Sequence, residues 1–244
     1  MPTRYRIDLA RPVPVPTEWL AAVVAQRLDD TANGPSISPH HTPPGTQVVP
    51  PWTLRPCRAD DDAVFFEINV IDDSPILAGR FTLFSEDALA GRLRVGNAKA
   101  GWTSLDVVAV TATATFDWQL LDRVGPVVAV HFRAVSPIVR ESPIEGRHIL
   151  TSARSWANRY GNNAVAFDAS ALGDELRLTG GVASRRKRYH SLSGEFCLRL
   201  QANNPSTSYA LAQLSVAAEF TGVGQKTRQG FGALDIIDVE RPEP

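Results

Sequence analysis

The order of strand and helix patterns limits the fold of this chain more than any other feature, because the same order occurs twice. In the first half, a strand, a helix, two strands, a helix and a strand are predicted at residues 5–9, 17–28, 52–55, 64–70, 85–90 and 102–116. In the second half, the order repeats at residues 127–135, 149–160, 176–178, 196–200, 209–220 and 233–237. The order β-α-β-β-α-β is that of a ferredoxin-like domain. We therefore predict an α+β protein of two tandem ferredoxin-like (RRM-like) domains, residues 1–125 and 126–244.

Residue periodicity supports these elements. Tyr5, Ile7 and Leu9 alternate with polar residues, as in a strand with one buried face. After Thr17, a residue type that caps helices, apolar residues recur at helical spacing. The strand at residues 127–135 is expected to end at the Ser-Pro pair that follows it, because proline has no N–H group for sheet pairing.

Composition excludes several classes of protein. With 244 residues and 43% hydrophobic content, the chain can bury a sizeable core. Its two cysteines, Cys57 and Cys197, form no C-x-x-C pair, so we expect neither a disulfide framework nor a cysteine zinc site. No apolar segment has the length of a membrane span or the form of a secretion signal. We expect a soluble cytoplasmic protein with no membrane partner.

The net charge of -1 excludes a uniformly basic protein, so a nucleic-acid partner would need a local group of cations. The densest basic run lies on the predicted hairpin of the second half, and its members are Arg185, Arg186, Lys187, Arg188 and His190. Arginine forks there would grip phosphates. The alternative is an ordinary solvated face.

Residues 31–51 contain six prolines and two adjacent histidines, His40 and His41. Proline propagates neither helix nor central strand, so an exposed ordered loop is predicted. Histidine titrates near pH 6.5 and both accepts and donates protons at neutral pH, although a solvated pair is the alternative. No metal site is expected, because the histidines are adjacent and no cysteine or carboxylate lies at a suitable local spacing.

The glycine-rich segment GVGQKTRQGFG, at residues 222–232, lies between a predicted helix and the last strand. It does not have the spacing of a P-loop. Glycine permits close approach of the backbone and positive φ, so successive N–H groups are expected to face a phosphate chain. Its candidate binding residues are Gly222, Gly224, Lys226, Arg228, Gly230 and Gly232. A helix end followed by a tight turn would use the same glycines.

This segment resembles the carboxy-terminal glycine-rich loop of the RAMP superfamily, particularly its CRISPR repeat-processing endoribonucleases. Ser136-Pro137 near the start of the second half and the short strand at residues 51–56, PWTLRP, are similar to further features of these proteins. The resemblance spans nearly the whole chain. It implies tandem ferredoxin-like domains and a histidine-bearing loop before that short strand.

The resemblance implies an endoribonuclease that cuts CRISPR repeat RNA in precursor crRNA without a metal or other cofactor. The 2′-OH would attack the adjacent phosphorus, which leaves a 2′,3′-cyclic phosphate and a 5′-OH. It implies His41 or His40 as the catalytic residue, with His41 favoured because it leads into the matched strand. Two alternatives stay open: a non-catalytic RNA-binding subunit that partners other subunits of a CRISPR effector complex, and a metabolic protein that binds a small phosphorylated ligand.

Overall fold

The structure is a computed structural model that describes residues 1–10, 17–28, 52–60, 63–72, 74–97, 101–160, 176–186, 188–201 and 204–243. The chain divides into two units, Met1–Phe116 with Arg228–Gly230, and Asp117–Thr227 with Phe231–Pro244. The domain limits predicted from the sequence, residues 1–125 and 126–244, stay a prediction. None of the described helices is long and apolar enough to cross a membrane.

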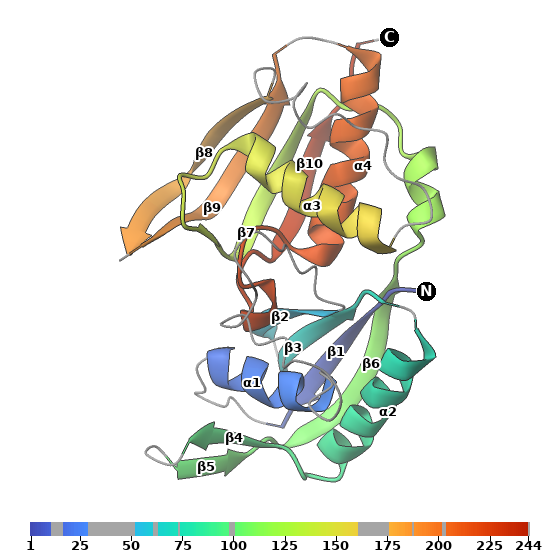
Figure 1. Ribbon diagram of the computed structural model, residues 1–244, viewed down its shortest axis with the longest axis vertical. Helices are drawn as coiled ribbons and strands as arrows, with labels where there is room; N and C mark the ends of the chain where they lie inside the picture. The colour runs from blue at the N-terminus through green and yellow to red at the C-terminus, as the bar shows by residue number, and fades with distance from the viewer. Residues whose placement is uncertain are drawn as a thin grey trace. The chain divides into compact units, whose positions relative to one another are not determined.

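The first unit contains one four-stranded antiparallel sheet in the order β2-β3-β1-β6. Its strands are β1 (Thr3–Leu9), β2 (Trp52–Asp60), β3 (Ala63–Val70) and β6 (Val107–Thr115), and its helices are α1 (Thr17–Leu28) and α2 (Pro75–Leu89). Both helices lie on one face of the sheet (Figure 1). The alternation in β1 places Ile7 on that face, opposite Phe66 of β3, and both side chains are fully buried.

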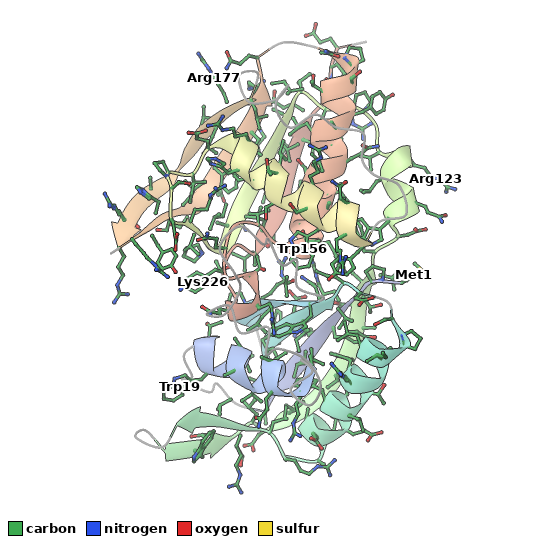
Figure 2. All side chains as sticks on the ribbon, in the orientation of Figure 1. Met1, Trp19, Arg123, Trp156, Arg177 and Lys226 are labelled. Atoms are coloured by element: carbon green, nitrogen blue, oxygen red, sulfur yellow. The ribbon has the colours of Figure 1, made fainter. Side chains whose placement is uncertain are left out.

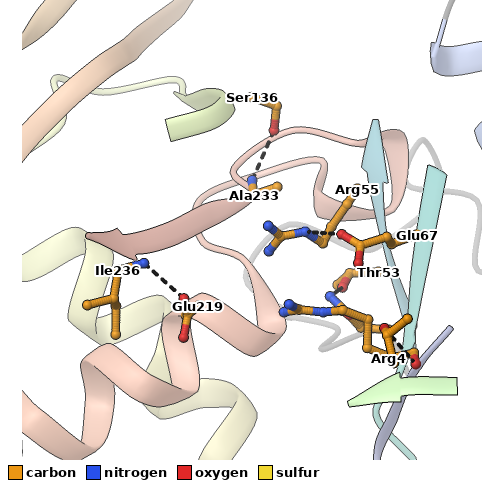
Figure 3. Close-up of polar contacts among 10 residues, drawn as sticks. Arg4, Thr53, Arg55, Glu67, Ser136, Glu219, Ala233 and Ile236 are labelled. Atoms are coloured by element: carbon orange, nitrogen blue, oxygen red, sulfur yellow. Dashed lines mark hydrogen bonds and ion pairs between the residues drawn. The ribbon is translucent and has the colours of Figure 1, made fainter. Parts of the chain in front are cut away.

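The other face of this sheet carries polar side chains. Arg4 Nε donates a hydrogen bond of 2.8 Å to Asn69 Oδ1, and Asn69 Nδ2 donates one of 3.1 Å to Thr53 Oγ1 (Figure 3). Arg55 pairs with Glu67, with 2.9 Å between Nε and Oε2. Because a buried charge is costly without a partner, these contacts allow β2 and β3 to hold polar groups away from water.

The second unit contains a four-stranded antiparallel sheet in the order β10-β7-β9-β8. Its strands are β7 (Ala129–Arg140), β8 (Leu176–Arg186), β9 (Tyr189–Leu200) and β10 (Leu234–Glu240), and its helices are α3 (Gly146–Tyr160), α4 (Pro205–Thr221) and the short η1 (Trp118–Arg123). If the four sheet strands of each unit are numbered in chain order, both sheets have the order 2-3-1-4, which in the second unit is read from β8 to β10. The predicted fold of two tandem ferredoxin-like domains is confirmed.

Two elements of the first unit differ from the prediction. Helix α2 begins at Pro75, ten residues before the predicted start, because Ser74 caps it by accepting a hydrogen bond from the Leu77 N–H and proline suits the first turn. The strand predicted at residues 102–116 is split into β5 (Gly101–Ser104) and β6, and β5 pairs with β4 (Arg94–Asn97) as a separate hairpin. Leu105, which separates β5 from β6, is buried.

The expectation that a strand ends at Ser136-Pro137 is wrong. Strand β7 continues to Arg140, and a shift of register between Ala134 and Ile138 accommodates the proline. Such a bulge leaves residues outside the sheet pairing, so the missing proline N–H costs no ladder hydrogen bond. The Ser136 Oγ instead accepts a hydrogen bond of 3.0 Å from the N–H of Ala233, which precedes β10 (Figure 3).

The buried face of α2 generates a test of core packing. Phe84 is fully buried, and its ring lies 5.7 Å from that of Phe81, whereas Leu83 on the same helix is 63% exposed. Phe84→Ala is expected to lower the free energy of unfolding by about 3–5 kcal/mol, because it leaves a cavity. Leu83→Ala is expected to change it by no more than about 0.5 kcal/mol. Urea unfolding followed by circular dichroism measures both values, and equal losses would contradict this packing.

Candidate nucleic-acid interface

The glycine-rich segment begins where α4 ends at Thr221. Its two ends are joined, because the Val223 N–H donates a hydrogen bond of 2.9 Å to the Gly232 carbonyl. The Gly232 N–H in turn donates to the carbonyl of Pro137 at 2.9 Å. The segment is therefore a closed loop attached to the extension of β7 beyond its bulge.

Six amide groups of this loop donate hydrogen bonds within the protein. The Gln225 N–H donates to the Val139 carbonyl at 2.9 Å, and the Gly224 N–H donates to Ser152 Oγ of α3 at 3.1 Å. The remaining internal donors are the N–H groups of Gly222, Val223, Phe231 and Gly232. The prediction that the backbone of this segment forms a phosphate cradle is wrong for these six amides, because their hydrogen bonds are already used.

The glycines serve close packing. At Gly232, with φ +72°, a Cβ would overlap the Val223 carbonyl oxygen. At Gly224, with φ +80°, a Cβ would lie 3.0 Å from the Val139 carbonyl oxygen. Both positions exclude a side chain, because positive φ is strained for other residues and the space is filled by backbone.

The loop presents Lys226 to the basic hairpin. Lys226 itself has φ +63°, and its Nζ lies 4.4 Å from the centre of the Tyr189 ring (Figure 2). The Arg188 guanidinium lies 5.1 Å from the same ring centre, and its Nη2 donates a hydrogen bond of 2.9 Å to the Tyr189 hydroxyl. Tyr189 thus joins two cationic segments that are 38 residues apart at Arg188 and Lys226.

The hairpin carries further cations. In the strand register, Arg186 of β8 lies opposite Tyr189 of β9, and Arg185 lies opposite His190. On its other side, His190 lies opposite Arg140 of β7. Arg185, Arg186 and Arg188 are exposed. Lys187 lies outside the described residues. Among the residues that the structure describes, basic side chains of β7, the β8–β9 hairpin and the glycine-rich loop thus lie near Tyr189 and His190. That this group binds RNA stays a prediction.

The surroundings shift the pKa values of the basic side chains here in both directions, and burial lowers the pKa of Arg140. The hydrogen bond to Tyr189 raises the pKa of Arg188 above its usual value. Glu141 forms an exposed ion pair of 3.3 Å with Arg188, a contact that water and salt weaken. Burial lowers the pKa of His148, at the start of α3, with Arg140 as the next cause. The sequence reasoning missed Arg140 and Tyr189, although Tyr189 stands inside the basic run.

Arg228 lies elsewhere. It belongs to the first unit, where its guanidinium is 4.7 Å from the centre of the fully buried Trp52 ring. Burial lowers the pKa of Arg228 to about 10, so it stays charged at neutral pH. Gly230, also part of the first unit, is buried where a Cβ would overlap the Thr17 methyl group. Arg228 and Lys226 therefore contact different aromatic rings, and Arg228 has the position of a packed side chain.

The predicted catalytic histidines, His40 and His41, lie outside the described residues, which resume at Trp52. Of the other histidines, His131 is paired with Glu240 at 2.9 Å between Nε2 and Oε1. This hydrogen bond holds the pKa of Glu240 below its usual value. Within the described part of the chain, no group of three or more histidine, cysteine, aspartate or glutamate side chains is arranged to hold a metal ion.

Comparison with solved structures identifies the fold. A Thermus thermophilus Cas6, solved as a product complex, is 20% identical, with 97% of this chain and 99% of that chain covered and a TM-score of 0.71. A second Cas6 product complex is 18% identical over the same shares, with a TM-score of 0.71. A Cas6-related protein from Pyrococcus furiosus is 15% identical, covers 98% of this chain and 99% of that one, and has a TM-score of 0.57. No family model and no curated protein matches the sequence. The chain has the fold of these Cas6 structures along nearly its whole length.

The closed loop generates a second test. Gly232→Ala is expected to lower the free energy of unfolding by at least about 2 kcal/mol, because it combines positive φ with overlap at the Val223 carbonyl. Gly125→Ala, where nothing lies within 4 Å of the added Cβ, is the matched control and is expected to be neutral or slightly stabilising. Thermal unfolding compares the two variants, and a stable Gly232→Ala protein would contradict the loop geometry.

Proposed function

We propose that this chain is a CRISPR endoribonuclease that binds repeat RNA and cuts precursor crRNA in a reaction that needs no metal ion. The observation that carries the proposal is the match of both domains, across 97% of the chain, to Cas6 structures that were solved as product complexes. The resemblance of residues 51–56 and 222–232 to repeat-processing enzymes supports it independently, because it was found in the sequence. The RNA would be processed in the cytoplasm.

The basic surface of the second unit supports RNA binding. Arg185, Arg186, Arg188 and Lys226 supply cations, and phosphate neutralisation dominates the affinity of proteins for nucleic acids. Lys187 and His190 of the same hairpin would add to this surface. The glycines would act indirectly in our proposal, because the internal hydrogen bonds of the loop fix the Lys226 backbone next to Tyr189.

The chemistry is assigned to the histidine-bearing loop. His41, or His40 beside it, would take the proton of the 2′-OH as its oxygen attacks phosphorus, or would donate a proton to the departing 5′-oxygen. The P–O5′ bond breaks as the O2′–P bond forms, so the products are a 2′,3′-cyclic phosphate and a 5′-OH end. No water is consumed in this step, and a nearby cation would stabilise the charge on the phosphorane oxygens.

Replacement of both histidines is the decisive test. His40→Ala combined with His41→Ala is expected to slow cleavage of the repeat RNA by at least about 100-fold in EDTA, because general acid–base catalysis contributes about this much. The affinity for the RNA is expected to change less than threefold. Gel analysis of the products measures the rate, and filter binding measures the affinity.

His131→Gln is the matched control, since His131 is engaged with Glu240 on the sheet. It is expected to cleave like the unmodified protein. Unchanged cleavage by the double variant would remove both loop histidines from the reaction. A protein that binds the repeat but never cuts it would instead be a non-catalytic RNA-binding subunit of a CRISPR effector complex.

A second test addresses the basic surface. Arg188→Gln combined with Lys226→Gln is expected to weaken repeat binding and to flatten the plot of log affinity against log salt by about 0.7–0.9 per lost phosphate contact. The matched control combines Arg123→Gln with Arg177→Gln and so removes the same amount of charge. These arginines lie on η1 and β8 (Figure 2). Fluorescence anisotropy at several salt concentrations measures both pairs. Equal slopes for the two double variants would exclude this surface as the RNA contact.

A further inference from the structure

The β4–β5 hairpin of the first unit has one face turned to the core and one turned to solvent. Val95 is 1% exposed and belongs to the hydrophobic core. Trp102, paired with Gly96 in the neighbouring position, is 62% exposed. Arg94 lies two residues from Gly96, so Arg94 and Trp102 project from the same face of the hairpin.

No side chain stands directly opposite Trp102 on the hairpin, because its partner is Gly96. At Gly96, with φ +140°, a Cβ would overlap the Gly101 carbonyl oxygen, so the position opposite Trp102 excludes a side chain. Among the described residues, no hydrogen bond, ring contact or cation contact engages the Trp102 indole. Its exposed ring offers a flat apolar face and one polar N–H to a ligand that can stack on it.

One arginine lies on this face and another precedes β4. Arg94 is exposed, and Arg92, two residues earlier, is exposed with its Nε 2.7 Å from Asp87 Oδ1. Asp87 also pairs with Arg27 of α1 at 2.9 Å. Arg92 and Arg27 thus share the Asp87 carboxylate. Arg94 lies on the same face as Trp102 and is the cation that an anionic ligand on this face would meet.

We propose that the β4–β5 hairpin is a stacking site for an unpaired base of single-stranded RNA. Trp102 stacks on the base and Arg94 neutralises the adjacent phosphate, the combination by which proteins bind single strands without reading their sequence. The apolar surface of this face is a single ring between Arg94, Gly96 and Ser104. That area matches one base and is too small for the apolar centre of a protein interface. The inference rests on the proposed function in taking RNA as the ligand, and it adds a contact distinct from the basic surface of the second unit.

The test is the affinity for a fluorescein-labelled single-stranded oligoadenylate of twelve nucleotides. Trp102→Ala is expected to weaken binding by about 5- to 100-fold, the effect of one lost base–aromatic contact. Trp102→Phe is expected to retain most of the affinity, and Arg94→Gln to lose a smaller part that disappears at high salt. Ile76→Ala, which removes another exposed apolar side chain of the first unit, is the control and is expected to bind normally.

Equal affinity of Trp102→Ala and the unmodified protein would overturn the stacking site, as would failure of the unmodified protein to bind the oligonucleotide. Self-association that depends on Trp102, with no change in RNA affinity, would also overturn it and assign the face to a protein contact. Repeat cleavage by the same variants separates this inference from the proposed function. If Trp102→Ala weakens binding, the stacking site is supported even when the protein cuts no RNA. If the protein cuts the repeat but binds RNA equally well with and without Trp102, the proposed function holds and the stacking site does not.

Discussion

The bulge in β7 is the constraint on which the arrangement of the second unit depends. Because Pro137 lies outside the sheet pairing, its carbonyl is free to accept the Gly232 N–H, and the Ser136 hydroxyl accepts the Ala233 N–H. These two hydrogen bonds fix the end of the glycine-rich loop just before β10 begins. The other end is fixed by Val139, two residues further along β7, which accepts the Gln225 N–H. One short strand extension therefore determines the path of the whole loop.

This path gives the glycines a structural role. Six N–H groups of this loop donate to β7, α3, α4 or the loop itself, so they cannot bind a phosphate chain at the same time. The loop can hold a side chain at a fixed place, and Lys226, with a positive φ that few non-glycine residues adopt, is the residue held. Backbone strain at such a position persists only where the surrounding structure enforces it. The loop is thus better understood as a rigid support for one cation beside Tyr189 than as a binding surface of its own.

Much of the fold was predictable, because it depends on local patterns. The apolar spacing after Thr17 predicted the limits of α1, and the alternation of Tyr5, Ile7 and Leu9 predicted β1, which begins two residues earlier at Thr3. The early start of α2 at Pro75 carried a usable signal, the Ser-Pro pair at a helix start, that the strand-like sequence before it obscured. The β4–β5 hairpin escaped prediction because the run of β-branched residues after Trp102 gives no sign of a break at Leu105.

The site was less predictable, because its contacts join distant residues. The Gly224 N–H donates a hydrogen bond to Ser152, which lies 72 residues earlier in the chain. The local sequence at either residue does not predict this contact. The basic run and the lysine of the glycine-rich loop were each visible, but Tyr189 as their meeting point required the hairpin register. Arg228, two residues from Lys226, takes a different place because Trp52 offers it an aromatic surface.

Membership of Arg228–Gly230 in the first unit has a consequence for the chain as a whole. A fragment that stops after the first ferredoxin-like sequence would contain Trp52 but would lack the guanidinium stacked on it. The complementary fragment would carry these three residues without the part of the first unit that they belong to. Separate expression of the halves would therefore yield an incomplete first fragment, and genetic exchange of one half between related proteins would have to carry this tripeptide with its aromatic partner.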